Sequence, residues 1–239
     1  MLSCILLLAA GAVALILYLR EKTKRYSVRG VLLKSAVSAL FIVLAVCAWY
    51  FSARGEPPKP LGLFVLPGLT LGLLGDVWLD LKYAFPQEDR TFTLAGFGAF
   101  GLGHVFYILG LNVQFLPAGK PLYAVVPIVL GALLGVANAL FGEKPMKLRF
   151  GKLKPVVAVY GALLFSTLLT AGSLALAHGW RETTLNLFFA GGALFAASDL
   201  VLSGTYFGEG RERPVDFIEN YLTYYGGQYL IAFSLYFLK

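Results

Sequence analysis

Long apolar runs separated by short polar links occupy the chain from one end to the other. Each run is close to the roughly 20 apolar residues that an α-helix needs to cross a bilayer. The pattern therefore predicts eight spanning helices, at residues 2–19, 31–51, 61–82, 91–112, 121–141, 155–178, 183–204 and 217–238. We expect an all-α polytopic membrane bundle in which residues 1–239 form a single transmembrane domain.

The composition agrees with a membrane protein and excludes an ordinary soluble domain. Hydrophobic residues make up 58% of the chain and charged residues 14%, with a mean hydropathy of +0.74, whereas roughly a quarter of the residues of a soluble domain are charged. The net charge of +7 would suit nucleic acid. However, the basic residues lie in the links, where they set topology and contact lipid headgroups. We therefore expect membrane lipid, and no nucleic acid, as a partner.

The basic residues also predict which side of the membrane each link occupies. The first run has no basic segment before it and leads into Arg20, Lys22, Lys24 and Arg25, which favours a retained anchor over a signal peptide. With Lys34 included, 15 Lys and Arg follow the odd-numbered runs and 5 lie on the other side. This places both termini outside. We expect a multi-pass protein of the cell membrane, specifically the plasma membrane of a bacterium.

Few ionisable side chains interrupt the apolar runs. A charged side chain at the centre of a spanning helix costs about 3 kcal/mol on insertion scales, so each one needs an explanation. The ionisable residues inside the runs are Lys34, Asp76, Asp80, His104 and Asp199. The last run adds further polar side chains, namely Asn220, Tyr221, Tyr224, Tyr225 and Gln228.

Depth places the two aspartates in one layer of the cytoplasmic half. At 1.5 Å per residue, Asp76 lies roughly 9 Å and Asp199 about 5 Å from the cytoplasmic ends of their helices. Lys34 is the one intramembrane cation near that layer, so one carboxylate must be protonated, bound to a metal or solvated. This favours a functional cavity around Asp76 and Asp199. The alternative is that interhelical hydrogen bonds and a Lys–Asp pair simply hold the bundle together.

Simpler explanations exist for three of the polar residues. Lys34 could snorkel to the interface, and Asp80, near a helix end, could be a solvated carboxylate. His104 lies some 10 Å beyond the carboxylate layer, where it could form the roof of the cavity or bond to a neighbouring helix. The two histidines lie far apart in predicted depth, and Cys4 and Cys47 lack the spacing of metal ligands. We therefore expect no metal, no disulfide and no cofactor.

A weak internal repeat connects the third run with the seventh. Asp76 is followed seven residues later by Tyr83, and Asp199 is followed seven residues later by Tyr206. Each half of the chain then holds four helices in the same orientation, as a parallel duplication requires.

Four motifs together are similar to those of one known family: Gly75-Asp76, Gly103-His104-Val-Phe-Tyr107, Ser198-Asp199-Leu-Val-Leu202 and Tyr224-Tyr225-Gly-Gly-Gln228. On these motifs the chain resembles the YhhN/TMEM86 family of lysoplasmalogenase-like integral membrane proteins, over essentially its whole length. The resemblance implies an eight-helix membrane enzyme that hydrolyses the vinyl-ether bond of lysoplasmalogens to a fatty aldehyde and a glycerophospho-base. It also implies that the two functional aspartates of the family are Asp76 and Asp199.

The residues suit this reaction. A vinyl ether hydrolyses when its β-carbon is protonated and water captures the resulting oxocarbenium ion, so the reaction needs a proton donor and a stabilising negative charge. Two carboxylates whose proton affinities are pushed apart supply both. We predict that Asp76 and Asp199 are catalytic. Either could be the general acid, while the other stabilises the cation or activates water.

A lysophospholipid substrate would be bound by the side chains around these carboxylates. The predicted substrate-binding residues are Lys34, Asp80, His104, Tyr107, Ser198, Asn220, Tyr224 and Gln228. Lys34 could hold the phosphate or interact with one carboxylate. The alternative function is that of a proton-coupled transporter or a lipid-binding membrane protein that uses the same carboxylates. Against a transporter, neither aspartate lies at a Gly or Pro break of the kind that often marks transporter sites.

Overall fold

A computed structural model describes residues 1–22, 28–53, 57, 59–208 and 213–238. Eight long α-helices account for most of these residues: α1 (Leu2–Lys22), α2 (Val28–Ala53), α3 (Leu61–Ala84), α4 (Asp89–Phe115), α5 (Leu122–Phe141), α7 (Lys154–Ala177), α8 (Thr183–Phe207) and α9 (Pro214–Ser234). The links contain the short helix α6 (Glu143–Met146) and the 3-10 turns η1 (Pro86–Glu88) and η2 (Gly151–Leu153), and η3 (Leu235–Phe237) follows α9. The predicted all-α fold is confirmed.

Seven of these helices are long and apolar enough to cross a membrane, which confirms a multi-pass membrane protein. They are α1 to α5, α7 and α8, with α4 and α7 extended by the 3-10 turns before them. The eighth long helix, α9, carries more polar side chains, among them Asp216, Glu219 and Asn220. Because many of its polar residues are buried against other helices, α9 does not need an apolar surface all round. Its place as an eighth span stays a prediction.

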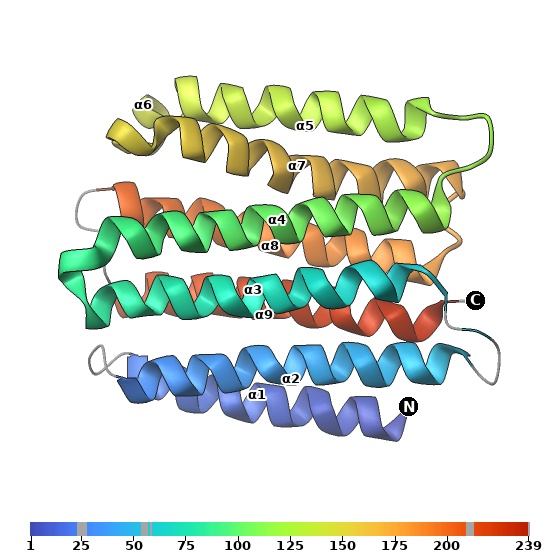
Figure 1. The fold of residues 1–239 in the computed structure, drawn as a ribbon, viewed down its shortest axis with the longest axis horizontal. Helices are drawn as coiled ribbons and strands as arrows, with labels where there is room; N and C mark the ends of the chain where they lie inside the picture. The colour runs from blue at the N-terminus through green and yellow to red at the C-terminus, as the bar shows by residue number, and fades with distance from the viewer. Residues whose placement is uncertain (23–27, 54–56, 58, 209–212, 239) are drawn as a thin grey trace.

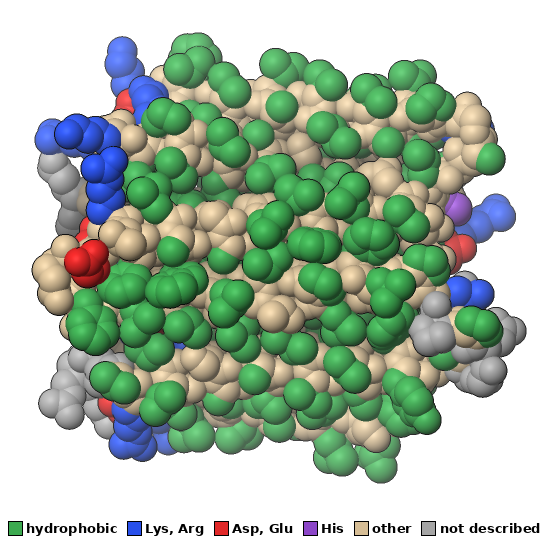
Figure 2. All heavy atoms as spheres, in the orientation of Figure 1, with side chains coloured by type: hydrophobic (Ala, Val, Ile, Leu, Met, Phe, Trp, Pro, Cys, Tyr) green, Lys and Arg blue, Asp and Glu red, His purple; other side chains and the backbone are tan. Residues whose placement is uncertain are grey.

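Successive long helices run in opposite directions, so the two ends of the chain lie at the same end of the bundle (Figure 1). The C-terminal ends of α1, α3, α5 and α8 lie at the opposite end. Figure 2 shows most of the Lys and Arg side chains of the visible face at that opposite end, with hydrophobic side chains covering the surface between the two ends. This distribution is what the positive-inside argument requires, and the orientation itself remains a prediction.

Helix pairing supports the internal repeat. In the first half α1 packs on α2, α2 on α3 and α3 on α4, and in the second half α5 packs on α7, α7 on α8 and α8 on α9. Between the halves, α2 contacts α9 and α4 contacts α7. If a two-fold relation exchanges α2 with α7 and α4 with α9, the contact between α2 and α9 becomes the contact between α7 and α4. Corresponding helices are therefore in contact in both halves, as a duplicated four-helix unit would give.

Glycines at the α3–α4 and α8–α9 crossings also correspond between the halves. A Cβ atom on Gly103 would lie 3.0 Å from the carbonyl oxygen of Gly68, and one on Gly227 would lie 2.6 Å from that of Gly191. Gly68 stands eight residues before Asp76, and Gly191 stands eight residues before Asp199. Small residues let two helix backbones approach closely, and here they bring each aspartate-bearing helix against its partner in the same way.

Candidate functional site

A cavity of about 80 Å³ lies inside the bundle, and both Asp76 and Asp199 line it. Its wall is formed mainly by side chains of α3, α4, α7, α8 and α9. The polar lining residues are Lys34, Asp76, Asn138, Tyr160, Ser198, Asp199, Ser203, Tyr206, Asn220, Tyr221 and Tyr224. The carboxylates that were predicted to share a cavity from their depth alone therefore do meet in one.

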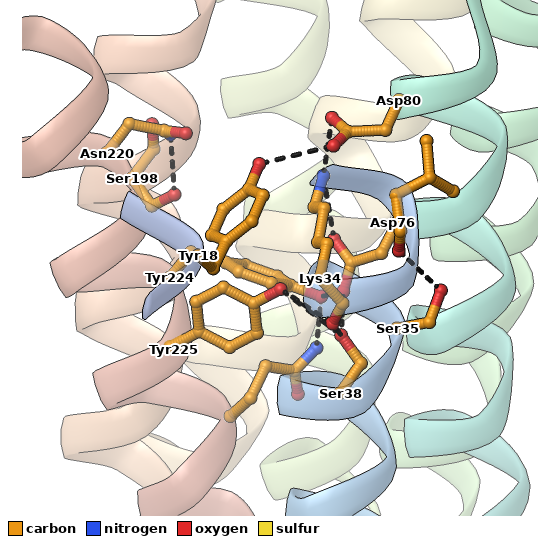
Figure 3. A network of polar contacts seen from close by, with 12 residues as sticks. Tyr18, Lys34, Ser35, Ser38, Asp76, Asp80, Ser198, Asn220, Tyr224 and Tyr225 are labelled. Carbon is orange, nitrogen blue, oxygen red and sulfur yellow. Dashed lines mark hydrogen bonds and ion pairs between the residues drawn. The ribbon is translucent and has the colours of Figure 1, made fainter. Parts of the chain in front are cut away.

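Asp76 lies in the middle of α3, which continues as a regular helix on both sides of it. One turn earlier, Gly72 leaves room for α9, since a Cβ atom there would lie 2.9 Å from Nε2 of Gln228. Three donors surround the Asp76 carboxylate. Ser38 donates to Oδ2 at 2.6 Å and Tyr224 donates to the same oxygen at 2.8 Å, while Lys34 Nζ lies 3.3 Å from Oδ1 (Figure 3).

Asp80, one turn further along α3, is buried in an ion-pair cluster. Its Oδ1 lies 3.0 Å from Lys22 Nζ. Lys34 Nζ lies 3.3 Å from the same oxygen, and Tyr18 donates to Oδ2 at 3.2 Å (Figure 3). The interpretation of Asp80 as a solvated carboxylate is therefore wrong, because the end of α1 covers it. Snorkelling of Lys34 is also wrong, since its side chain is buried between two carboxylates. The Lys–Asp pair of the alternative interpretation is therefore present, with Lys34 between Asp76 and Asp80.

Asp199, on α8, has much simpler surroundings. The hydroxyl of Tyr160 on α7 donates to its Oδ2. In the described part of the chain, no basic side chain lies within the 4.0 Å of an ion pair. α8 is also a regular helix through this position. The two cavity carboxylates therefore differ: Asp76 is paired with a cation, whereas Asp199 is held by one neutral hydroxyl.

Ser198 and Asn220 lie beside Asp199 in the cavity wall. The Asn220 amide donates to the Ser198 carbonyl oxygen at 2.8 Å and to the Ser198 hydroxyl at 2.9 Å (Figure 3). These bonds fix the α8–α9 contact next to the carboxylate. Both residues were predicted to bind substrate, and their position in the lining leaves that role open to them.

Three other predicted site residues lie behind the cavity wall instead of in it. Tyr107 donates to Oε1 of Gln228 at 3.2 Å, and the Gln228 amide donates to the Tyr224 hydroxyl at 3.3 Å, which continues the chain of hydrogen bonds to Asp76. His104 pairs through Nδ1 with Thr167 of α7 at 3.1 Å. Of its two predicted places, the bond to a neighbouring helix is therefore the one observed. None of these three residues lines the cavity, and neither does Asp80; they contact residues around it.

The link between α5 and α7 contributes one side chain to the cavity wall. Phe150 in this link is buried and lines the cavity. Its backbone N–H donates to Glu143 Oε1 at 2.8 Å, and Lys154 Nζ lies 2.8 Å from the other oxygen of Glu143. The bond from Lys154 and the bond from the Phe150 amide together hold the pKa of Glu143 below its ordinary value. The neighbouring Leu148 forms an isolated antiparallel bridge to Gly208.

Lys22 and Tyr160 are among the contributors to the site that the sequence-based prediction lacks. Lys22 was placed in the link after the first run, but α1 continues as a helix to Lys22 and carries its ammonium to Asp80. Its position four residues after Tyr18 puts both on one helix face, which is the signal that could have identified it. Tyr160 lies within an apolar run, with no polar neighbour in sequence to mark it.

In the part of the chain that the structure describes, no three His, Cys, Asp or Glu side chains lie close enough together to hold a metal ion. The expectation that the site works without a metal or cofactor stays a prediction. Lys24 and Arg25, which belong to the predicted basic link, lie outside the described residues.

The sequence model of the YhhN family matches residues 31–235, which begin in the first turn of α2, extend through α9 and include both cavity aspartates. The chain belongs to the YhhN family. No curated protein and no solved structure matches it significantly. The membership confirms the resemblance seen in the four motifs.

Proposed function

We propose that this YhhN family protein is a membrane hydrolase that cleaves the vinyl-ether bond of lysoplasmalogens or of a related lysolipid, releasing a fatty aldehyde and a glycerophospho-base. The observation that carries the proposal is the pair of carboxylates, Asp76 and Asp199, in one cavity inside an apolar bundle. An ionisable group inside a membrane protein is costly and marks a functional site by default. Two of them facing one cavity supply both the proton and the negative charge that the reaction needs.

The cavity also suits a substrate with an aliphatic chain. Apolar side chains from α4, α7 and α8 form much of its wall, among them Phe100, Leu164 and Leu200. Leu200 is 43% exposed on the outside of the bundle, where lipid would lie. The lining therefore extends from the carboxylates to the surface of the bundle beside α8. An alkenyl chain could bind along this apolar lining.

The polar lining gives the glycerol oxygens and water their partners. Ser198, Asn220 and Tyr224 reach the cavity from α8 and α9 and would orient these groups. Lys34 is engaged with Asp76 and Asp80 at 3.3 Å, so we assign it to holding the carboxylates and not to binding the phosphate. We propose the plasma membrane of a bacterium as the location.

The direct test uses purified protein in lipid nanodiscs with a lysoplasmalogen as substrate and mass spectrometry to measure aldehyde release. We expect release by the wild type and loss of at least about a thousandfold, or about 4 kcal/mol in the barrier, in Asp76→Asn and Asp199→Asn. Asp89→Asn is the matched control, since Asp89 is an exposed carboxylate at the start of α4. An ester-linked lysophospholipid of the same chain length reports whether the vinyl ether is required.

Full hydrolysis by folded Asp76→Asn and Asp199→Asn variants would contradict this proposal. So would a wild-type protein that releases no aldehyde from any lysolipid but takes up protons together with a solute in liposomes. That second result would favour the transporter.

A further inference from the structure

We infer that the two aspartates have separate tasks: Asp199 is the proton donor of the reaction, Asp76 is ionised in the resting protein, and Tyr160 positions the proton of Asp199. This inference rests on the proposed function, which leaves the order of the two aspartates open. It comes from the difference between the groups that surround them.

The surroundings of Asp76 fit an ionised carboxylate. Two hydroxyl groups, from Ser38 and Tyr224, donate to one oxygen, and the ammonium of Lys34 faces the other. The Tyr225 hydroxyl lies 3.2 Å from the Ser38 hydroxyl, so it can donate to Ser38 while Ser38 donates to Asp76. Each hydrogen-bond or ion-pair partner of the carboxylate among the described residues is thus a donor, and hydrogen bonds to the charged form together with a nearby cation favour that form.

Among the ion-paired side chains of this cluster that the structure describes, the charges balance when Asp76 is ionised. Lys22 and Lys34 bring two positive charges, and both contact Asp80, which supplies one negative charge. Asp76 supplies the second through Lys34. Buried charges are tolerated when they are paired and hydrogen-bonded, so protonation of Asp76 would leave a buried lysine without its counter-charge. Lys22, Lys34 and Asp80 therefore act as positioning residues for Asp76.

The surroundings of Asp199 fit a protonated carboxyl group. A neutral hydroxyl from Tyr160 contacts Oδ2, and in the described residues no cation is near enough to balance a charge. Oδ1 of Asp199 has no hydrogen-bond partner in that part of the chain, and Asp199 lines the cavity. A carboxylate without a counter-ion in an apolar bundle takes up a proton instead of staying charged. The proton on Oδ1 is then available to a molecule in the cavity.

These tasks give a balanced reaction. Asp199 donates its proton to the β-carbon of the vinyl ether, where the C=C π pair forms the new C–H bond, and Asp76 stabilises the resulting oxocarbenium ion. Water adds to the cationic carbon and gives a proton to Asp76. The hemiacetal then collapses: its hydroxyl proton goes to Asp199, its C–O bond breaks, and Asp76 returns its proton to the leaving glycerol oxygen. Both carboxyl groups regain their starting state.

Infrared spectroscopy of the resting protein tests the assignment without relying on activity, because a protonated carboxylic acid has a C=O stretch that a carboxylate lacks. At neutral pH we expect this band in the wild type, its loss in Asp199→Asn and its retention in Asp76→Asn and in the Asp89→Asn control. Asp199→Glu keeps an acid at this position and should retain both the band and part of the activity. The folded state of each variant is checked by thermal unfolding.

Tyr160→Phe tests the positioning role. Removal of the Tyr160 hydroxyl should shift the frequency of the Asp199 C=O band, whereas a purely structural role of Tyr160 would leave this frequency unchanged. The variant should also lower kcat more than it raises KM. A band that survives in Asp199→Asn, or that disappears in Asp76→Asn, overturns the inference, and so does an unchanged band frequency in Tyr160→Phe. By contrast, a wild type that shows the band but releases no aldehyde contradicts the proposed function and not the protonation of Asp199.

Discussion

Lys34 of α2 holds its ammonium 3.3 Å from Oδ1 of Asp76 on α3, and this contact links the stability of the bundle to the chemistry of its cavity. The pair is buried, with 5% and 3% of the two side chains exposed. Bringing two charges out of water is costly, so such a pair adds little net stability while it is intact. Breaking it is different, because the remaining charge is left without a partner.

We therefore expect Lys34→Met to be strongly destabilising. Removal of one partner of a buried ion pair costs about 3–5 kcal/mol, and here Asp76 loses its cation while Asp80 keeps Lys22. The measurement is the thermal or denaturant unfolding of the purified protein in detergent. Lys120→Met, an exposed lysine before α5, is the control and should change stability by less than about 0.5 kcal/mol.

The double variant Lys34→Met with Asp76→Asn separates the charge effect from lost packing. It removes both members of the pair, so we expect it to regain a large part of the stability lost in Lys34→Met, without regaining hydrolysis. If the double variant were as unstable as Lys34→Met, the loss would come from packing of the lysine stem and not from an unpaired Asp76.

Gly227→Ala should loosen the contact between α8 and α9. Its Cβ atom would lie 2.6 Å from the carbonyl oxygen of Gly191, a backbone atom that can move only if the helices separate. We expect a loss of about 1–3 kcal/mol, as for other overpacked sites. The neighbouring Gly226→Ala is the control, because its Cβ atom would make an ordinary contact at 3.5 Å with Leu194. Unfolding measurements that gave both variants equal stability would exclude a tight crossing here.

The helices and the layer of carboxylates could be predicted from the sequence because both follow from local pattern. Apolar runs of about 20 residues predict spans, and residue spacing along a helix gives depth, which placed Asp76 and Asp199 at one level. The pattern does not give the partners across helices. Depth alone could not distinguish Asp76, which faces Lys34, from Asp199, which faces Tyr160.

The remaining differences arise where an element ends or where a link folds back. α1 extends past the apolar run to Lys22, because a lysine in the last turn of a helix can pair with Asp80 on a neighbouring helix. The short helix α6 lies in the same link as Leu148, which bridges to Gly208 directly after α8. No periodicity in the link itself signals them.

Acid should release the link that carries Phe150. The bonds that Glu143 accepts from Lys154 and from the Phe150 amide lower its pKa relative to the unfolded chain, where the ordinary value is about 4.3. The stabilisation is therefore present above about pH 4.3 and is lost as the pH falls through the lower folded pKa. Hydrogen exchange at the Phe150 amide, corrected for its intrinsic pH dependence, should show protection at neutral pH that disappears in this acid range.

Glu143→Gln should remove the pH dependence of Phe150 protection. The glutamine side chain does not ionise, and it bonds only weakly to the ammonium of Lys154. The variant should show low protection of Phe150 already at neutral pH. Glu182→Gln, before α8 at the opposite end of the bundle, is the control and should behave as the wild type. Protection of Phe150 that is the same at all pH values in the wild type would show that Glu143 does not hold the link.

Ala196→Phe should block the cavity without unfolding the bundle. Ala196 is on α8, is 5% exposed and lines the cavity, so an aromatic ring there would enter the space between Asp76 and Asp199. We expect hydrolysis to fall by about tenfold or more, which corresponds to about 1.4 kcal/mol in the barrier.

The neighbouring Ala197 is exposed on the surface of α8, and Ala197→Phe should leave hydrolysis unchanged. Because the ring of Ala196→Phe fills existing space, the unfolding temperatures of the two variants should be similar. If Ala196→Phe hydrolysed lysolipid at the wild-type rate while remaining folded, the substrate would have to reach the carboxylates by another route.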